Sequence, residues 1–258
     1  MQHARLIVDP PLEGPVNMGR DEALLAACRD ASHAPVLRFY AWAPPTISLG
    51  YFQDYAEYEA LEGPVAGLAV VRRTTGGGAI LHDLEITYSL TIPIEHPLVH
   101  RRPNRLYELA HEAIIAAVGN GVRMLGCDNS ACDASAQRGP FFCFARRHGL
   151  DVVVEDGRGP MGISKFAGSA QRRTPTAILQ HGSIMLDSRF DQQPTATWSQ
   201  VAGSPVTFEA AAQRLAPAFA NALGMALDES ELTSEELDAA DGFSRRYAGS
   251  PWTRDRVR

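Results

Sequence analysis

The 258-residue sequence predicts an α+β fold in which helices flank a mixed, mainly antiparallel sheet. Three observations support this prediction. Strand-like segments cluster in the middle of the chain, amphipathic segments lie irregularly around them, and the two kinds do not alternate strictly as they do around a parallel sheet. The sequence contains no internal repeat, so we expect a single domain over residues 1–258, with a helical C-terminal portion at about 207–258.

The first half of the chain is expected to contain one helix and four strands. Asn17 precedes a run of leucines and alanines and is the expected N-cap of the helix. The strand segments are short and apolar or alternate polar and apolar residues, and Pro44 and Pro45 separate the first two. The helix and the four strands are expected at 17–30, 36–40, 46–50, 69–72 and 85–93.

The second half is expected to contain three strands, three helices and two long loops. Asn104 is the expected cap of the first helix, and Thr233 supplies N-cap chemistry for the last. The strand segments are rich in β-branched residues. The strands are expected at 122–127, 150–155 and 177–187, the helices at 104–118, 207–223 and 234–247, and the loops at 157–162 and 187–205.

Composition narrows the class of protein. The net charge of −6 argues against a broad nucleic-acid-binding surface. No apolar run approaches the roughly 18 residues of a membrane helix, and the N-terminal segment lacks the apolar core of a signal peptide. We therefore expect a cytoplasmic monomer with reduced thiols and no membrane partner. No C-x-x-C pair occurs, so no metal site is expected among the cysteines Cys28, Cys127, Cys132 and Cys143.

Three consecutive glycines, Gly76, Gly77 and Gly78, follow the strand at 69–72. Glycine tolerates positive φ and lets a ligand lie against the backbone, while Arg72 and Arg73 could hold an anion or a polarised carbonyl. The segment lacks the GK[ST] of a phosphate-binding loop and the G-x-G-x-x-G of a dinucleotide site. The alternative is a glycine-rich hairpin with two surface arginines.

The same segment carries a resemblance to a known family. Residues 72–83, RRTTGGGAILHD, closely resemble the RR-x-x-GGG-x-x-x-HD signature of lipoate-protein ligases and octanoyltransferases. Further segments are similar to that family in the same order, so the resemblance spans about 17–252. These segments are WAPPTISLGYFQ at 42–53, KFAGSAQ at 165–171, ILQHGSIML at 178–186 and the C-terminal stretch at 232–252.

The resemblance implies the catalytic-domain fold of the biotin and lipoate ligases, with an acyl group beside the glycines. It implies that a lysine loop carries Lys165 to the acyl carbonyl. A lone histidine inside a strand is more often structural, so His181 stays open between a pocket role and a structural one. The substrate-binding residues implied are Arg72, Arg73, Gly76, Gly77, Gly78, His82, Gly168, Ser169, Ala170 and His181.

The family performs two chemistries, and Cys143 bears on the choice between them. Ligases activate a free acid with ATP and Mg, whereas transferases start from an acyl thioester and need no cofactor. Cys143 is followed by Phe144 and lies where cysteine-dependent octanoyltransferases carry their nucleophile. Ligases usually carry an Asn-Asp pair in the place of Leu150 and Asp151. The alternative for Cys143 is a structural thiol buried among phenylalanines.

The transferase interpretation is chemically coherent. A free thiol has a pKa of about 8.5, so a nearby Lys165 ammonium would favour the nucleophilic thiolate. Attack on an acyl-carrier-protein thioester would give a Cys143 thioester, which a lysine of a lipoyl domain would then open. The resemblance implies acceptors such as the glycine cleavage H protein or the E2 subunit of a 2-oxoacid dehydrogenase.

One departure from the family pattern bears on the site. Residues 158–164, RGPMGIS, form a longer connection before Lys165 than the tight turn usual in the family. We expect a harmless surface loop, although a displaced Lys165 would undermine the mechanism. Two alternatives to the octanoyltransferase therefore stay open: an ATP-dependent lipoate-protein ligase acting through lipoyl-AMP, and a non-catalytic acyl-binding homologue.

Overall fold

The computed structural model describes residues 2–119, 121–126, 140–159 and 162–257. Its strands are β1 (Gln2–Val8), β2 (Val36–Tyr40), β3 (Thr46–Leu49), β4 (Ala69–Arg72), β5 (Ile80–His82), β6 (Glu85–Pro93), β7 (Val122–Met124), β8 (Val152–Glu155), β9 (Ile163–Arg173), β10 (Ala177–Met185) and β11 (Met225–Glu229). Its α-helices are α1 (Gly14–Ala27), α2 (Tyr55–Glu59), α3 (Arg105–Val118), α4 (Trp198–Ala202), α5 (Phe208–Leu223), α6 (Ser234–Ala248) and α7 (Ser250–Asp255).

An eight-stranded sheet forms the centre of the molecule, in the order β11-β1-β2-β6-β10-β9-β8-β7. β1 runs parallel to β2 and to β11, and the other neighbours pair antiparallel. The mixed, mainly antiparallel sheet predicted from the sequence is therefore confirmed. β9 carries a bulge where it pairs with the start of β8, opposite Val152 and Val153.

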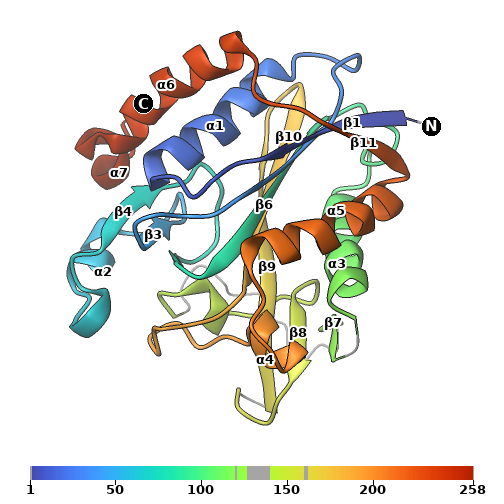
Figure 1. Cartoon of the computed structure of the whole chain (residues 1–258). Coiled ribbons are helices and arrows are strands. Elements are labelled where there is room, and N and C mark those ends of the chain that lie inside the picture. The colour runs from blue at the N-terminus through green and yellow to red at the C-terminus, as the bar shows by residue number, and fades with distance from the viewer. Residues whose placement is uncertain (1, 120, 127–139, 160–161, 258) are drawn as a thin grey trace.

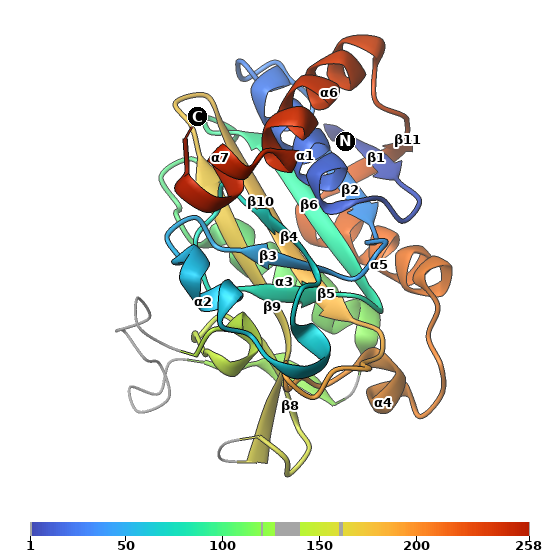
Figure 2. The same cartoon turned by 90° about the vertical axis from the view of Figure 1, so that its left-hand side faces the viewer.

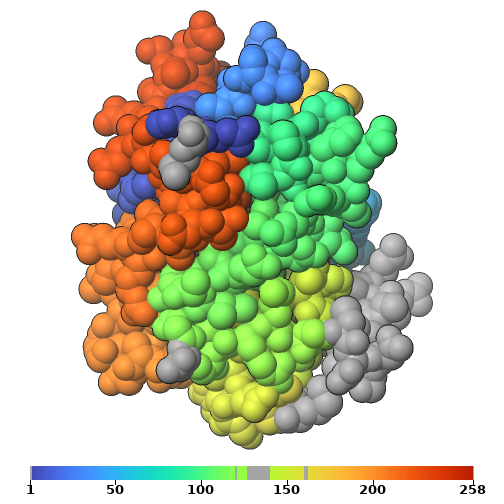
Figure 3. Space-filling model, turned by 90° about the vertical axis from the view of Figure 1, so that its right-hand side faces the viewer, coloured from blue at the N-terminus to red at the C-terminus, as the bar shows by residue number. Residues whose placement is uncertain are grey.

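Helices cover both faces of this sheet (Figure 1). α3 and α5 lie together on one face and enclose the largest apolar core, where the Phe219 ring meets Phe39 and Tyr88 at 5.8 and 5.1 Å. Figure 3 shows that face, with α3 in green and α5 in orange. Burying a large side chain contributes about 1.5–3 kcal/mol, so this layer supplies much of the fold's stability. α1 and α6 pack together on the opposite face.

A smaller sheet, β4-β3-β5, stands in front of the large one on the side of α1 (Figure 2). β4 leads into the three glycines and β5 leaves them, so this sheet fixes both ends of the glycine-rich segment. The C-terminal α7 closes over β4, because the indole N–H of Trp252 donates to the Arg72 carbonyl at 2.8 Å. The last helix thus supports the segment that carries the family signature.

The start of α1 differs from the prediction. The helix begins at Gly14 after Glu13, with proline in its first turn, where the missing N–H costs nothing. Asn17 therefore lies inside the helix and is not its cap. Its buried side-chain amide instead donates to the carbonyls of Leu12 and Ala41, at 3.1 and 2.9 Å.

Other boundaries follow from pairing that spans long stretches of sequence. The segment expected as a lysine loop is the middle of β9, held between β8 and β10. β1 and β11 were not predicted, and they pair with each other across the whole chain, starting at Gln2 and Met225. The C-terminal portion is therefore not purely helical. α4 interrupts the loop expected at 187–205.

Two expectations extend beyond what the structure describes. The strand expected at 122–127 ends at Met124, and Cys127 and Cys132 lie outside the described residues. The loop expected at 157–162 is described at its two ends, where the N–H groups of Asp156 and Gly157 donate to the Gly162 carbonyl. In the described ranges, no helix is long and apolar enough to cross a membrane.

Candidate active site

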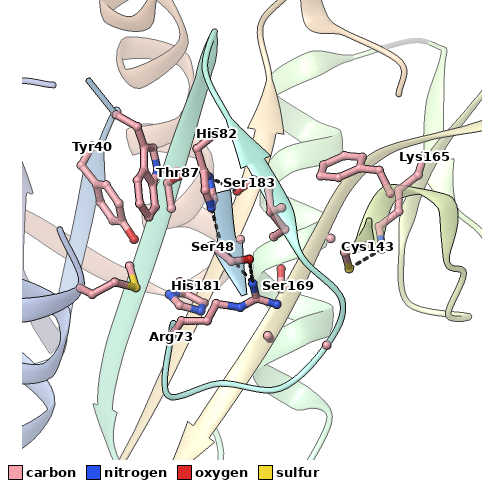
Figure 4. A pocket seen from close by; sticks show the side chains of 18 residues that line it. Tyr40, Ser48, Arg73, His82, Thr87, Cys143, Lys165, Ser169, His181 and Ser183 are labelled. Carbon is pink, nitrogen blue, oxygen red and sulfur yellow. Dashed lines mark hydrogen bonds between the residues drawn. The ribbon is translucent and has the colours of Figure 1, made fainter. Parts of the chain in front are cut away.

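A cavity of about 490 Å³, which includes its open mouth, lies between the glycine-rich segment and the middle of the large sheet (Figure 4). Cys143 and Lys165 stand together at one end, and Tyr40 lies at the other. Met18 and Trp42 form one apolar cluster with Tyr40 and also line the cavity, so that end is largely apolar. Such a shape suits a ligand with a reactive head and an apolar tail.

Cys143 and Lys165 come together although the chain between them is long. The Lys165 Nζ lies 3.8 Å from the Cys143 Sγ and 2.9 Å from the Asp151 Oδ2. Burial alone would lower the pKa of Lys165, but the neighbouring Asp151 and Cys143 outweigh it and raise this pKa above its usual value. Lys165 is therefore an ammonium at neutral pH, within the distance over which its charge stabilises a thiolate. The 158–164 connection does not separate the pair.

Gly168 makes room for the Lys165 side chain. A Cβ at this position would lie 2.4 Å from the Lys165 Cε and 2.6 Å from its Nζ. The strand bulges beside these residues, since Val152 pairs with Ala167 while Val153 pairs with Lys165. The bulge and the missing side chain together let the lysine fold back along its own strand toward Cys143.

Cys143 is held against the glycine-rich segment by backbone hydrogen bonds. Its N–H donates to the Ala79 carbonyl at 2.7 Å, and the Ala79 N–H donates to Phe141 at 2.9 Å. The fit is close, because a Cβ on Gly78 would lie 3.1 Å from the Cys143 Cα. Phe144 is buried beside it while Cys143 itself is half-buried, so the thiol is not part of a closed core.

Arg73 lines the cavity and holds the glycine-rich segment in shape. Its guanidinium donates to the carbonyls of Gly76 and Gly78 at 2.8 and 2.7 Å, and to the Ser48 carbonyl at 2.8 Å. Burial lowers the pKa of Arg73 to about 10, which still leaves it charged at neutral pH. Gly77 also lines the cavity, with a φ of +91° that disfavours any other residue.

Arg72 points away from the cavity. Its guanidinium donates to the carbonyls of Thr253, Gly50 and Gln53 at 2.8, 3.0 and 2.7 Å. It therefore joins the C-terminal helix to the β3 end of the site. Gly76 likewise faces a neighbouring groove instead of the cavity. The substrate contacts expected of these two residues are not part of the cavity wall.

The two histidines of the family motifs lie in the cavity wall. The His82 ring contacts Glu85 at 2.9 Å and Ser48 at 2.7 Å and stacks on Trp42 with ring centres 3.8 Å apart. Burial lowers the pKa of His82, outweighing the effect of Glu85. His181 contacts Thr75 at 2.7 Å. Both rings are fixed by neighbouring side chains.

The structure also reveals a polar chain that the sequence did not. His111 of α3 contacts the Ser169 hydroxyl at 2.7 Å, and Tyr88 meets the same hydroxyl at 2.6 Å. The other ring nitrogen of His111 contacts the Leu150 carbonyl, next to Asp151. Burial lowers the pKa of His111 to about 4, so the ring is neutral and donates to that carbonyl. Its place on the buried face of the 104–118 helix was the only available signal.

Gly168, Ser169 and Ala170 all line the cavity, as the resemblance implied for that stretch. Ser169 is held from behind by His111 and Tyr88. The cavity wall therefore has an ordered polar side near the middle of β9. No group of three or more histidine, cysteine or carboxylate side chains is placed to hold a metal ion among the residues that the structure describes.

These features define a cavity with a paired thiol and ammonium at one end and apolar side chains at the other. The lipoyl protein ligase A/B catalytic domain model matches residues 13–220. The chain therefore belongs to the lipoyl protein ligase A/B catalytic domain family, and this confirms the resemblance stated from its motifs.

Relatives and solved structures agree with this placement. The octanoyltransferase LipM of Kyrpidia tusciae is 33% identical, with 98% of each chain covered. The octanoyltransferase LipM of Bacillus subtilis is 32% identical, with 92% of each covered. A putative lipoate protein ligase from T. acidophilum shares the fold, with a TM-score of 0.77 at 20% identity over 99% of both chains. At that identity the structural likeness concerns the fold alone.

Proposed function

We propose that this protein is an octanoyltransferase of lipoate biosynthesis, which moves an octanoyl group from acyl carrier protein to a lysine of a lipoyl domain. The observation that carries the proposal is the Cys143 thiol 3.8 Å from a buried, charged Lys165. The LipM octanoyltransferases that match over almost the whole chain support the same reaction.

The first half-reaction loads the enzyme. The Cys143 thiolate attacks the carbonyl carbon of the octanoyl thioester and forms a new C–S bond. The tetrahedral oxyanion then collapses, the C–S bond to the carrier breaks, and the carrier thiolate leaves and takes a proton from water. The Lys165 ammonium lies close enough to the sulfur to stabilise negative charge in this step.

The second half-reaction transfers the octanoyl group from Cys143 to the acceptor. A neutral lysine amine of the acceptor domain attacks the Cys143 thioester, the C–S bond breaks, and the new amide loses a proton to water. The Cys143 thiolate is regenerated beside Lys165. Exchange between thioesters is nearly balanced in energy, and amide formation draws the sequence forward, so ATP has no part in it.

The apolar end of the cavity suits the octanoyl tail. Met18 and Trp42 line it at the end away from Cys143, where burying methylenes contributes about 0.8 kcal/mol each. The head of the acyl group then lies at Cys143 and its tail runs past Arg73 and His82.

The test is octanoyl transfer from octanoyl-acyl carrier protein to a lipoyl domain with no ATP present. We expect ping-pong kinetics for the wild type and a loss of at least about 10³-fold for Cys143→Ala. Transfer that requires free acid and ATP would instead identify a lipoate ligase. Undiminished transfer by Cys143→Ala would contradict the proposal.

A further inference from the structure

A second, open groove of about 790 Å³ runs beside the cavity. It is bounded by the outer side of the glycine-rich segment, the start of α3 and the end of β9. Its walls include Phe52, Gly76, Tyr107, Arg172 and Arg173. None of these residues takes part in the reaction steps described above.

Adjacent residues line the groove and the cavity at two points of the chain. Gly76 lines the groove and the next residue, Gly77, lines the cavity. Likewise Ala170 lines the cavity and the next residue along β9, Gln171, lines the groove. Gly77 shares its cavity with Cys143, so the glycine-rich segment forms a wall of both the groove and the cavity that holds the thiol.

The groove carries positive charge in a chain whose net charge is −6. The Arg172 guanidinium has no hydrogen bond or ion pair with any residue that the structure describes, and its backbone pairs with Leu179 of β10. Within the described part of the chain, the Arg173 side chain donates only to neutral oxygens, the Pro103 carbonyl at 2.6 Å and the Gln171 side chain at 3.0 Å. Arg101 and Arg102 are exposed in the turn that precedes α3. No carboxylate of the described residues lines the groove, so an anion can bind there without displacing one of them from the arginines.

The groove also has an apolar rim. Phe52 is 78% exposed, the most exposed large hydrophobic side chain among the described residues. Its ring stands edge-on to Tyr51 with centres 5.0 Å apart, and it lies beside Gly76. Exposed aromatic rings next to arginines are typical of surfaces that bind a partner.

We propose that this groove docks the acyl carrier protein that donates the octanoyl group, with its phosphopantetheine arm laid along the groove. Arg172 and Arg173 hold the phosphate, Phe52 and Tyr107 flank the arm, and the thioester passes Gly76 to reach Cys143. This inference rests on the proposed function and adds the site at which the donor is recognised.

The distance from the groove arginines to the Cys143 thiol distinguishes the donor from the acceptor as the ligand of the groove. The Lys165 amine folds back to lie beside Gly168, and Arg172 is four residues further along β9, which is about 13 Å of strand. An acceptor lysine extends only about 6 Å and carries no anionic group, so a lysine anchored at these arginines would not reach the thiol. A phosphopantetheine arm is several times longer than a lysine side chain and begins at a phosphate.

The experiment compares two donors, octanoyl-acyl carrier protein and octanoyl-pantetheine, which lacks both phosphate and protein. We expect Arg172→Glu to raise the KM for the protein donor about 10-fold or more, with kcat and the acceptor KM unchanged. Phe52→Ala should act in the same direction. The rate with octanoyl-pantetheine should be unchanged in Arg172→Glu, which also shows that this variant is folded. Arg158→Glu, near the opposite end of β9, is the matched control and should leave every constant unchanged.

Each outcome bears on the proposal. An unchanged KM for the protein donor in Arg172→Glu and Phe52→Ala would overturn it. A raised KM for the lipoyl domain alone would overturn it as well, by making the groove the acceptor's site. If the wild type acylates Cys143 from neither thioester, the proposed function itself fails; acylation that is insensitive to the groove variants refutes only the docking site.

Discussion

At the scale of single residues, the site depends on how Asp151, Lys165 and Cys143 share charge. The Lys165 ammonium stands between the Asp151 carboxylate at 2.9 Å and the Cys143 sulfur at 3.8 Å. Asp151 keeps a buried lysine charged, and that charge then faces the nucleophile. Asp151 does not touch the reacting atoms, so it is a positioning residue.

This arrangement predicts a shift in pH dependence for Asp151→Asn. Asp151 is the main group that raises the pKa of Lys165, so its neutral replacement should lower that pKa. The alkaline limb of the kcat/KM profile should then move to lower pH, with a loss of about 10-fold near pH 9. Profiles for both proteins check this, and an alkaline limb that stays in place would count against the role of Asp151.

His111 predicts a pH dependence of stability. Its pKa is about 4 in the folded protein because of burial, and the ordinary value is 6.5. The unfolded chain therefore binds the proton first as pH falls, so this contribution is complete above about pH 6.5 and is lost toward pH 4. Its full size is on the order of 3 kcal/mol.

Urea unfolding across that pH range tests the contribution against His111→Gln, which cannot titrate. The wild type should lose more free energy of unfolding than the variant between pH 6.5 and 4.5. Parallel curves for the two proteins would show that His111 has no such effect.

At the scale of elements, β9 decides whether the site forms. The family resemblance implied a lysine loop here, yet the segment pairs with β8 in its first half and with β10 in its second. The motif residues could be located from the sequence because their order is local. Their strand geometry and the bulge could not, since both depend on partners that lie elsewhere in the chain.

Dependence on partners that lie elsewhere in the chain also explains which other contacts of the site could not be predicted from the sequence. Cys143 and Lys165 could be proposed from the family pattern, but not the Asp151 ion pair or the contact between His111 and Ser169. Arg72 and Arg73 are adjacent in sequence and were given the same role. On a strand, neighbouring side chains point to opposite faces, so only Arg73 lines the cavity.

In β9, the missing side chain of Gly168 is expected to be required for the position of the Lys165 ammonium. Gly168→Ala places a methyl group 2.6 Å from the present position of the Lys165 Nζ, so the ammonium must move from Cys143. We expect a loss of transfer of about 100-fold or more, while circular dichroism shows a folded protein.

The control is Gly242→Ala in α6, where the nearest atom to a new Cβ is 3.9 Å away. It should keep full activity and gain up to about 1 kcal/mol in stability, as alanine does in helices. Wild-type kcat in Gly168→Ala would show that the lysine position is not required.

At the scale of the whole molecule, the C-terminal helices brace the glycine-rich segment from outside. Trp252 is buried against Tyr247 and bonds to the Arg72 carbonyl, while Arg72 returns a bond to Thr253. β11 meanwhile completes the edge of the large sheet beside β1. The end of the chain therefore contributes to the site without lining it.

Trp252→Ala should accordingly destabilise the protein by about 3–5 kcal/mol, the usual cost of removing a buried aromatic side chain. Val257→Ala, at a position 57% exposed, should change the free energy of unfolding by less than about 0.5 kcal/mol. Denaturant titration measures both. Equal stability of the two variants would mean that α7 does not support β4.

In the proposed reaction, Cys143 carries the octanoyl group during transfer. The most direct measurement is mass spectrometry of the protein after incubation with octanoyl-acyl carrier protein, without ATP and without acceptor. We expect an octanoyl adduct on the Cys143 peptide that hydroxylamine removes and that disappears when a lipoyl domain is added. A wild-type protein that transfers octanoyl groups while Cys143 stays unmodified would contradict it.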